Sequence, residues 1–197
     1  MDMTGEELIA APRERVYEAL NDVDILKQSI PGCEEIEKTS DTEMTAKVVI
    51  KVGPVKAKFS GKVTLSDLNP PEGYTISGQG KGGPAGFAKG GAKVRLEESG
   101  SDTILHYEVH AEVGGKLAQI GGRLIDSTAK KLAGQFFTNF SAIVGAPDGG
   151  EQAGEAAAPS AQDSSQSQTT GSHGRFIALG VVFVIAVTIA AYLLLGR

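Results

Sequence analysis

Apolar and polar residues alternate with a period of two along several stretches of residues 1–145. The side chains of strand residues point alternately to two faces, so this alternation predicts strands with one apolar face. Short turns join consecutive stretches, which favours an antiparallel sheet with one covered and one solvated face. The apolar sets are Met44, Ala46, Val48, Ile50 and Val52; Val55, Ala57, Phe59, Val63 and Leu65; and Leu105, Tyr107, Val109, Ala111 and Val113.

Helical spacing occurs on both sides of these strands. Residues 11–30 predict two short helices, with Pro12 in a first turn and Asp22 at a cap. Residues 115–145 predict one long helix that could cover a sheet curled around it. We therefore predict an α+β helix-grip fold for residues 1–145. The apolar residues of the long helix are Leu117, Ile120, Leu124, Ala129, Leu132, Phe136, Phe140 and Ile143.

The rest of the chain has two compositions. Residues 146–174 contain no leucine, isoleucine, valine or aromatic residue. Such a segment cannot bury enough apolar surface to offset the entropy of ordering, so we expect a disordered linker with an average span of about 30 Å. Residues 175–197 hold 21 uncharged residues between two arginines. A helix of that length crosses a bilayer, so we predict a C-terminal transmembrane anchor.

The N-terminal sequence and the single cysteine bear on location. The first 16 residues are acidic and lack the apolar core of a signal peptide. Cys33 has no partner for an internal disulfide, which agrees with a reducing compartment. Only two residues follow the predicted span. We therefore expect a single-pass protein of the cell membrane with its N-terminal domain in the cytoplasm.

The stretch GQGKGG, residues 78–83, has the G-x-G-x-x-G spacing of a dinucleotide-binding loop. That function requires a helix to begin on the loop, because the amides of the helix N-terminus hold the phosphates. The sequence that follows is rich in glycine and then alternates with a period of two. We therefore predict a strand, a mobile or closely approached glycine connection centred on Phe87, and another strand, with no nucleotide site.

Catalytic and metal-binding motifs are sparse. The chain has no Walker, C-x-x-C, H-E-x-x-H or G-x-S-x-G motif. His106 and His110 alternate with Glu108 and Glu112 on the polar side of one predicted strand. A pair two residues apart could share a metal, but a solvated sheet face explains the same residues better. We predict no catalytic residue and no metal site.

The net charge of −5 conceals an uneven distribution. Residues 1–43 contain twelve acidic and four basic residues, whereas residues 44–66 contain five lysines and no acid. The sequence thus predicts a polarised surface with a basic hairpin. The lysines could simply keep an exposed face soluble, or they could contact anionic headgroups or an acidic partner. Nucleic acid is excluded because basic and aromatic residues do not alternate. The five are Lys47, Lys51, Lys56, Lys58 and Lys62.

Several stretches resemble the CoxG family of carbon monoxide dehydrogenase proteins, within the START-like helix-grip (SRPBCC) superfamily. They are LNDVDILKQSIPGCEEIE, the segment from GPVKAKFSG to GGAKVRLEE, and GGKLAQIGGRLIDSTAKKLAGQFFTNF. The resemblance covers roughly residues 2–145. It implies an accessory protein of a CO dehydrogenase-type molybdenum hydroxylase that recruits the enzyme to the membrane or delivers a quinone to it, without being an enzyme itself.

The resemblance also implies an apolar cavity for a lipid or quinone such as menaquinone or ubiquinone, not covalently bound. Two alternatives stay open at this point: a pure membrane adaptor with a filled core, and a helix-grip enzyme of the cyclase or hydrolase kind. An adaptor would bind the dehydrogenase without extracting lipid, and an enzyme would need acid–base groups inside the cavity. The residues expected to line the cavity are Phe59, Tyr74, Phe87, Leu117, Ile120, Leu124, Phe136 and Phe140.

Overall fold

The computed structural model describes residues 1–146. The predicted strands and helices are all present, and they follow one another along the chain in the predicted order. The elements are β1 (Asp2–Ile9), α1 (Arg13–Ala19), α2 (Val23–Ser29), β2 (Cys33–Ser40), β3 (Glu43–Val52), β4 (Val55–Asn69), β5 (Gly73–Lys81), the 3-10 turn η1 (Gly83–Ala85), β6 (Phe87–Ser99), β7 (Asp102–Gly114), α3 (Lys116–Gln119) and α4 (Gly122–Val144).

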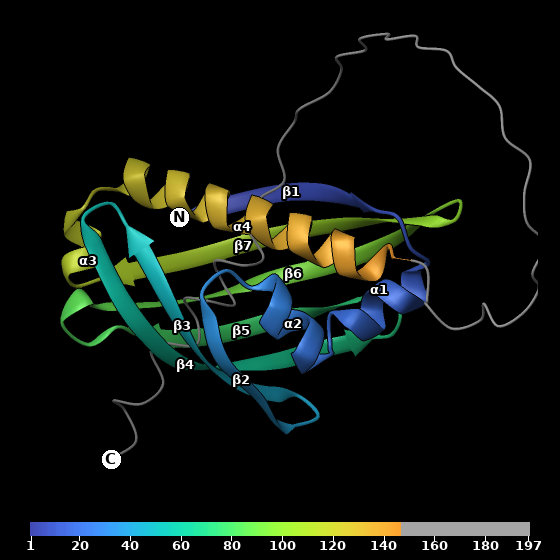
Figure 1. Ribbon diagram of the computed structural model, residues 1–197, viewed down its shortest axis with the longest axis horizontal. Coiled ribbons are helices and arrows are strands. Elements are labelled where there is room, and N and C mark those ends of the chain that lie inside the picture. Colours follow the sequence, from blue (N-terminus) through green and yellow to red (C-terminus); the bar gives the residue numbers. More distant parts are fainter. Residues whose placement is uncertain (147–197) are drawn as a thin grey trace, which may run out of the picture.

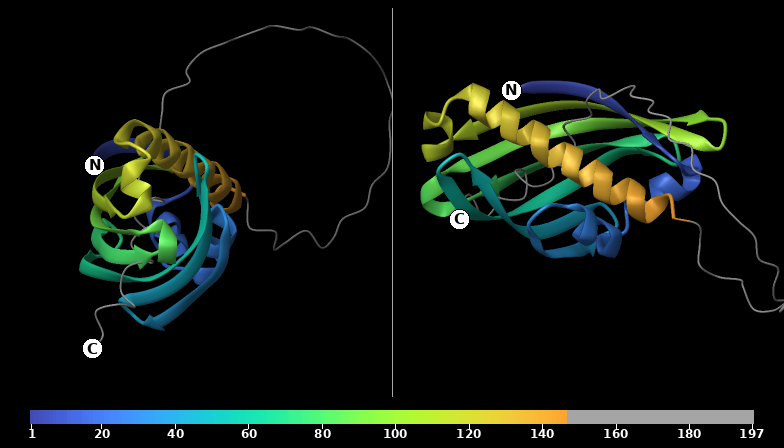
Figure 2. Two further views of the ribbon diagram at one scale, coloured as in Figure 1. Left: turned by 90° about the vertical axis from the view of Figure 1, so that its left-hand side faces the viewer. Right: turned by 45° about the horizontal axis from the view of Figure 1, so that its top comes forward.

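The strands form one antiparallel sheet that curls around α4. The strand order is β1-β7-β6-β5-β4-β3-β2, so every neighbour except the β1–β7 pair is also consecutive in sequence. Figure 1 shows α4 running across the concave side of the sheet, and the end-on view in Figure 2 shows the curl. This arrangement confirms the predicted curled antiparallel sheet with a long C-terminal helix.

The predicted long helix is wrong in one respect, because the structure breaks it into α3 and α4. Gly121 has a φ of +96° and precedes the first residue of α4. Positive φ is strained for residues with a Cβ, so a glycine at this joint allows the turn. The buried stripe of α4 is also shifted from the predicted one, and Leu124 lies outside it. The buried residues are Ile125, Ala129, Ala133, Phe136, Phe137, Phe140 and Val144.

The two short helices form where the sequence predicted them, and a side-chain cap fixes the start of α2. Asp22 precedes α2 and its carboxylate accepts hydrogen bonds from the amides of Asp24 and Ile25 at 2.8 and 3.1 Å. Such a cap satisfies amide groups that have no partner within the helix. Pro12 lies just before α1 in an extended conformation. These helices close one end of the curled sheet, beside the C-terminal end of α4 (Figure 1).

The predicted linker and transmembrane anchor lie outside the described residues, apart from Ala146. Within residues 1–146, no helix has both the length and the apolar character needed to cross a membrane.

Candidate functional site

Small residues form a row across the inner face of the sheet. Gly61 in β4 pairs with Ala46 in β3 on one side and with Gly80 in β5 on the other. Gly90 in β6 pairs with Gly78 in β5 and with Ala111 in β7. All these residues belong to the inner face of the sheet. In each strand, the residues two positions before or after them are buried, and residues two apart in a strand lie on the same face. The backbone of α4 approaches the sheet at β1 and β3, on either side of this row.

This row was not predicted from the sequence, although its signal is present there. The large apolar residues of each strand identify which positions lie on its inner face. Glycine or alanine occupies some of these inner positions, and in the sheet those positions lie beside one another. What the sequence did not provide was the register that brings the positions together. A sheet surface without large side chains is one requirement of a ligand site between sheet and helix. At Gly90 close backbone packing also favours glycine, because an added Cβ would lie 2.1 Å from the His110 carbonyl oxygen.

Four of the predicted cavity residues are buried aromatic residues, but they do not converge on one point. Phe136 and Phe140 stack on each other with ring centroids 5.4 Å apart. Phe59 packs close to Gly82, whose added Cβ would lie 2.5 Å from the ring. Tyr74 packs at the α1 and α2 end, with its ring edge against Tyr17 at 5.8 Å. The residue after Tyr74 pairs with Ser66, so Tyr74 and Phe59 lie eight residues apart in register, roughly 26 Å along the strands.

The other four predicted cavity residues lie around the α3 end of the domain. Leu117 is buried, and Ile120 and Leu124 lie over Gly53 in the turn between β3 and β4. Phe87 occupies the outward phase of β6 because Ala88 takes the inward one, and its ring covers Gly114. The exposed fractions of Phe87 and Leu124 are 43% and 39%. A ligand-binding role for these residues stays a prediction.

The glycine-rich connection joins two antiparallel strands, as predicted, but Phe87 is the first residue of β6 and not the centre of the connection. No helix begins on it, because β5 leads through η1 directly into β6. A Cβ added to Gly86, whose φ is +113°, would lie 2.0 Å from the carbonyl oxygen of Gly114. The glycines therefore allow backbone segments to approach closely, and the phosphate-binding geometry is absent from this turn.

An apolar cavity of about 20 Å³ lies beneath α1 and α2. That volume is about the space one water molecule requires, far below the roughly 300–1,000 Å³ of pockets for drug-sized ligands. The cavity is closer to Tyr74 than to the row of small residues. Its lining residues are Leu20, Leu26, Ile36, Met44, Val63, Leu65, Tyr74 and Ile76.

Two ionisable residues face the interior near the β1 edge. The Tyr107 hydroxyl is buried and has no hydrogen-bond partner among the described residues, and its ring stacks on Phe137 at 5.8 Å. Burial raises the pKa of Tyr107, and the carboxylate of Glu7 raises it further. Glu7 lies in the inward phase of β1, and partial burial raises its own pKa. An unpaired buried hydroxyl costs stability unless a ligand or water satisfies it.

The basic hairpin of the predicted polarised surface is largely neutralised, because β2 brings its acids beside it. Lys47 contacts Glu35 at 2.5 Å, and Lys58 contacts Glu34. Lys62 contacts Glu43 at the start of its neighbouring strand. Sequence separation concealed this pairing, since β2 precedes β3 and pairs with it in the antiparallel sheet. Lys51 and Lys56 stand apart from these pairs as Cα partners near the tip of the hairpin.

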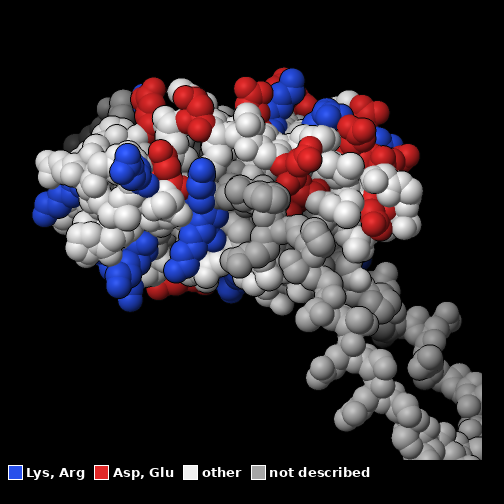
Figure 3. Space-filling view, turned by 90° about the horizontal axis from the view of Figure 1, so that it is seen from above, with Lys and Arg blue, Asp and Glu red and all other residues white. Residues whose placement is uncertain are grey.

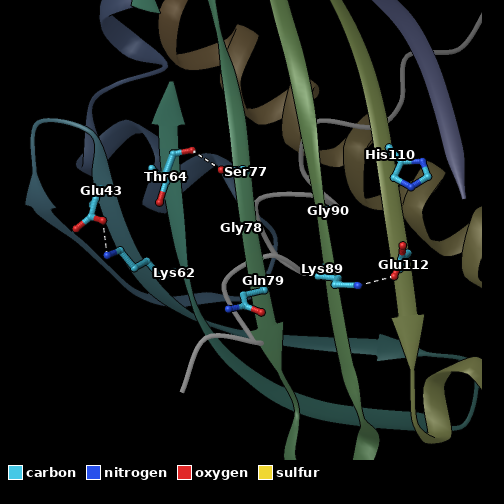
Figure 4. Close-up of a pocket in the computed structure, with 10 residues that line it drawn as sticks. All are labelled: Glu43, Lys62, Thr64, Ser77, Gly78, Gln79, Lys89, Gly90, His110 and Glu112. Atoms are coloured by element: carbon cyan, nitrogen blue, oxygen red, sulfur yellow. Dashed lines mark hydrogen bonds and ion pairs between the residues drawn. The ribbon is translucent and has the colours of Figure 1, made fainter. Parts of the chain in front are cut away.

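The outer face of the sheet carries a shallow hollow of about 570 Å³ (Figure 4). Its charged groups are largely paired: Lys62 with Glu43, and Lys89 with Glu112 at 2.8 Å. The hydrogen bond from Lys89 lowers the pKa of the Glu112 carboxyl, and the pairing leaves little unbalanced charge for a ligand. This face therefore has the character of a solvated sheet surface.

The two strand histidines contact single carboxylates rather than a metal-binding cluster. His110 Nδ1 lies 2.5 Å from Asp2, and this hydrogen bond lowers the pKa of the Asp2 carboxyl. His106 lies 3.6 Å from Glu6 and 3.4 Å from Glu97 on opposite sides of its ring. Within residues 1–146, no three histidine, cysteine, aspartate or glutamate side chains are arranged to hold a metal ion. These contacts tie β1 and β6 to β7.

A comparison with protein-family models identifies the family to which this domain belongs. The model of the CoxG family, named for a carbon monoxide dehydrogenase component, matches residues 5–145. The chain belongs to the CoxG family. The comparison with curated proteins gave no match.

Solved structures show where the CoxG fold sits among known folds. A conserved protein from Geobacillus kaustophilus is 31% identical, with a TM-score of 0.69 over 73% of this chain and 95% of that one. A START superfamily protein from Mycobacterium smegmatis is 13% identical, with a TM-score of 0.57 over 73% and 96%. The Zhui aromatase/cyclase from Streptomyces sp. R1128 is 11% identical, with a TM-score of 0.53 over 73% and 93%. The last two share the fold alone, and the fold is START-like.

Proposed function

We propose that this protein is a membrane-associated accessory protein of a CO dehydrogenase-type molybdenum hydroxylase. The match of residues 5–145 to the CoxG family carries the proposal, because the family is named for a component of CO dehydrogenase. The uncharged sequence of residues 176–196 supports attachment to the cell membrane, with the domain on its cytoplasmic side. The protein would hold the enzyme beside the bilayer, where its electrons can pass to a lipid-soluble acceptor.

We further propose that the domain carries a quinone-like lipid between the sheet and α4. The row of small residues from Ala46 to Ala111 supports this site, because a flat apolar ring needs a sheet surface without large side chains. Ala111 is buried yet lies outside the contiguous hydrophobic core formed by the described residues. The unsatisfied Tyr107 hydroxyl, on the same strand as Ala111, is a potential donor to a ligand carbonyl.

Ligand entry would require α4 to move. The apolar cavity of about 20 Å³ is too small for a quinone ring. The joint between α3 and α4 is suited to such a movement, because no atom lies within 4 Å of a Cβ added to Gly121 or Gly122. Leu124 and Ile120 contact the turn at Gly53 and would separate from it as the helix moves. Burial of the ring and part of the isoprenoid tail would then supply the affinity.

A pure adaptor with a filled core is the second candidate. The stacking of Phe136 and Phe140, both fully buried, favours it because these rings fill space beneath the sheet. An adaptor would recruit the dehydrogenase without taking up a lipid. The quinone carrier and the adaptor would both bind the dehydrogenase, but only the carrier would contain a lipid.

Mass spectrometry of organic extracts from the detergent-purified full chain distinguishes a quinone carrier from a pure adaptor. We expect a quinone in the native protein and none in Ala111→Leu, which would fill the row of small residues. Ser77→Leu adds the same side chain on the outer face and serves as the control that keeps the quinone. No quinone in the native protein, together with capture of the dehydrogenase, would support the adaptor. Failure to capture the dehydrogenase would reject the accessory role itself.

A further inference from the structure

One end of the domain carries lysines that no acid balances. This end consists of the β3–β4 turn, η1, α3 and the first turn of α4, on the left in Figure 1. Lys51 and Lys56 lie directly opposite each other across the β3–β4 hairpin, and both are exposed. Like charges in this position repel each other and cost stability. Lys116, the first residue of α3, is exposed at the same end. We define the basic tip as Lys51, Lys56 and Lys116 with Phe87 and Leu124.

The lysines of the basic tip differ from those elsewhere on the sheet. Lys47, Lys62 and Lys89 each contact a glutamate on a neighbouring strand. Within residues 1–146, none of the three basic-tip lysines forms an ion pair. Figure 3 shows basic side chains toward the left-hand end of the molecule, while most acidic ones lie on the right. The basic tip therefore presents a local positive charge on a protein whose net charge is −5.

A groove of about 560 Å³ runs between the hairpin and the η1 turn at this end. Three lysines contribute to its wall, and no acidic residue is among the ten that line it. Lys58 is the lysine of the groove that already contacts a glutamate, Glu34. The other lining positions are apolar or glycine. The lining residues are Pro54, Val55, Lys56, Ala57, Lys58, Gly82, Gly83, Pro84, Ala85 and Lys116.

Exposed apolar side chains lie beside these lysines. Phe87 and Leu124 are two of the four large hydrophobic residues that are exposed in residues 1–146. The other two, Leu8 and Leu68, lie on β1 and near the β4–β5 turn. Lysines that flank protruding apolar side chains are typical of surfaces that bind the headgroup region of an anionic membrane.

We propose that the basic tip docks on a bilayer that contains anionic phospholipids. The lysines contact the headgroup phosphates, and Phe87 and Leu124 enter the interfacial layer. The inference rests on the membrane location in the proposed function and adds the orientation of the domain. In that orientation the joint at Gly121 and the turn at Gly53 face the membrane, so a lipid ligand would pass between bilayer and domain without crossing bulk water.

The length of the chain beyond the domain permits this orientation. The last described residues lie beside Ala10, at the end of α4 opposite the basic tip. The 23 residues of α4 separate the two ends by about 34 Å. Residues 147–174 are 28 in number, and an extended chain of that length spans up to roughly 90–100 Å. The basic tip can therefore reach the same membrane that the C-terminal sequence would enter.

Vesicle sedimentation with residues 1–146 tests the docking surface without the predicted anchor. This segment is a complete fold, because the Geobacillus kaustophilus structure corresponds almost entirely to it. Vesicles of phosphatidylglycerol with phosphatidylcholine are compared with vesicles of phosphatidylcholine alone. The triple variant Lys51→Gln, Lys56→Gln, Lys116→Gln is compared with Lys47→Gln, Lys62→Gln, Lys89→Gln. Both variants remove the same charge, and circular dichroism confirms that each is folded.

We expect the native segment to bind the anionic vesicles, and binding to weaken as salt is added. The basic-tip variant should lose affinity by up to roughly 100-fold, since each lysine near the surface contributes about 1 kcal/mol. The matched variant should lose much less. Leu124→Ser should weaken binding without changing its salt dependence. Free inorganic phosphate should not compete at equal ionic strength, because the ligand is a surface rather than a single anion.

Three outcomes would overturn the inference: no binding of the native segment to anionic vesicles, equal losses in the two triple variants, or binding of the dehydrogenase at the basic tip in place of lipid. Quinone extraction and dehydrogenase capture use neither vesicle binding nor the lysine variants. If they succeed while vesicle binding fails, the docking surface is wrong and the proposed function stands. If they fail while vesicle binding succeeds, the proposed function is wrong and the docking surface stands.

Discussion

The two ends of this domain are built from the same strands but by different means. At the α1 and α2 end, large side chains interlock: Tyr17 meets Tyr74 edge to face, and the buried Thr103 hydroxyl donates a hydrogen bond to the Ala11 carbonyl at 2.7 Å. At the opposite end, Gly86 and Gly115 have positive φ and bring two backbone segments together.

The two ends therefore differ in what they contribute to the stability of the domain and to binding. Buried rings at the α1 and α2 end contribute apolar burial, which dominates the free energy of folding. The other end has exposed apolar side chains, unpaired lysines and a joint in the helix, none of which stabilises the fold. We infer that the closed end holds the domain together and that the basic tip is the part adapted to bind. Four predictions test this contrast.

The largest effect should come from Phe136 in the buried stripe of α4. Phe136→Ala removes a ring that is fully buried and stacks on Phe140, so we expect a loss of about 3–5 kcal/mol in the free energy of unfolding. Urea denaturation of residues 1–146 measures it. Phe87→Ala is the matched control at the basic tip and should cost less than about 1 kcal/mol, because its ring is 43% exposed. If the two variants lose similar amounts of unfolding free energy, the two ends do not differ in their contribution to stability.

A second effect comes from the glycines of the basic tip. Gly86→Ala combines a φ of +113° with a Cβ only 2.0 Å from the Gly114 carbonyl oxygen, so we expect a loss of roughly 2–4 kcal/mol. Gly83→Ala has a positive φ of +55° but no atom within 4 Å, and should cost about 1–2 kcal/mol. Thermal and urea unfolding of the two variants compare them. If Gly83→Ala is the more damaging, close backbone approach is not what the glycines provide.

The sequence predicted the closed end better than the basic tip. The alternation in Met44–Val52 and the cap at Asp22 are local signals, and both elements form where expected. Leu124 was assigned to the cavity from its helical spacing, and Phe87 from its place at the centre of the glycine-rich connection. The structure places both at the surface, since a single glycine at position 121 resets the helix phase and Ala88 takes the inward phase of β6.

Charge pairing and the small-residue row required the register of the sheet. The lysines of residues 44–66 seemed unbalanced because Glu34 and Glu35 precede them in sequence, but β2 lies directly beside β3. Gly61 and Gly90 are 29 residues apart in sequence, and their pairing with Gly80 and Gly78 of β5 brings them within two residues of one another in register. Sequence periodicity determines the face of each strand, whereas pairing between strands determines which residues meet across it.

A third and smaller effect concerns the cap at the closed end. Asp22→Ala removes the carboxylate that accepts two amide hydrogen bonds at the start of α2, so we expect a loss of about 1 kcal/mol in the free energy of unfolding. Asp22→Asn keeps an acceptor and should restore most of it. Urea denaturation at neutral pH measures both variants. If Asn fails to rescue, the charge of Asp22 rather than its hydrogen bonds stabilises the helix.

The smallest effect should be a change in the pH dependence of stability at Glu7. Burial raises the pKa of this carboxyl above its ordinary value of 4.5, so the folded state holds its proton more tightly than the unfolded state does. The contribution to stability is therefore present below about pH 4.5 and is lost as the pH rises through the higher folded pKa. Glu7→Gln cannot ionise, so it should be slightly more stable than the native protein at pH 7 and lose that advantage at pH 4. Partial exposure limits the gain to a few tenths of a kcal/mol at most. Glu108→Gln, on the exposed outer face of β7, is the control, and an equal gain there would mean that net charge rather than burial at the closed end sets the pH dependence.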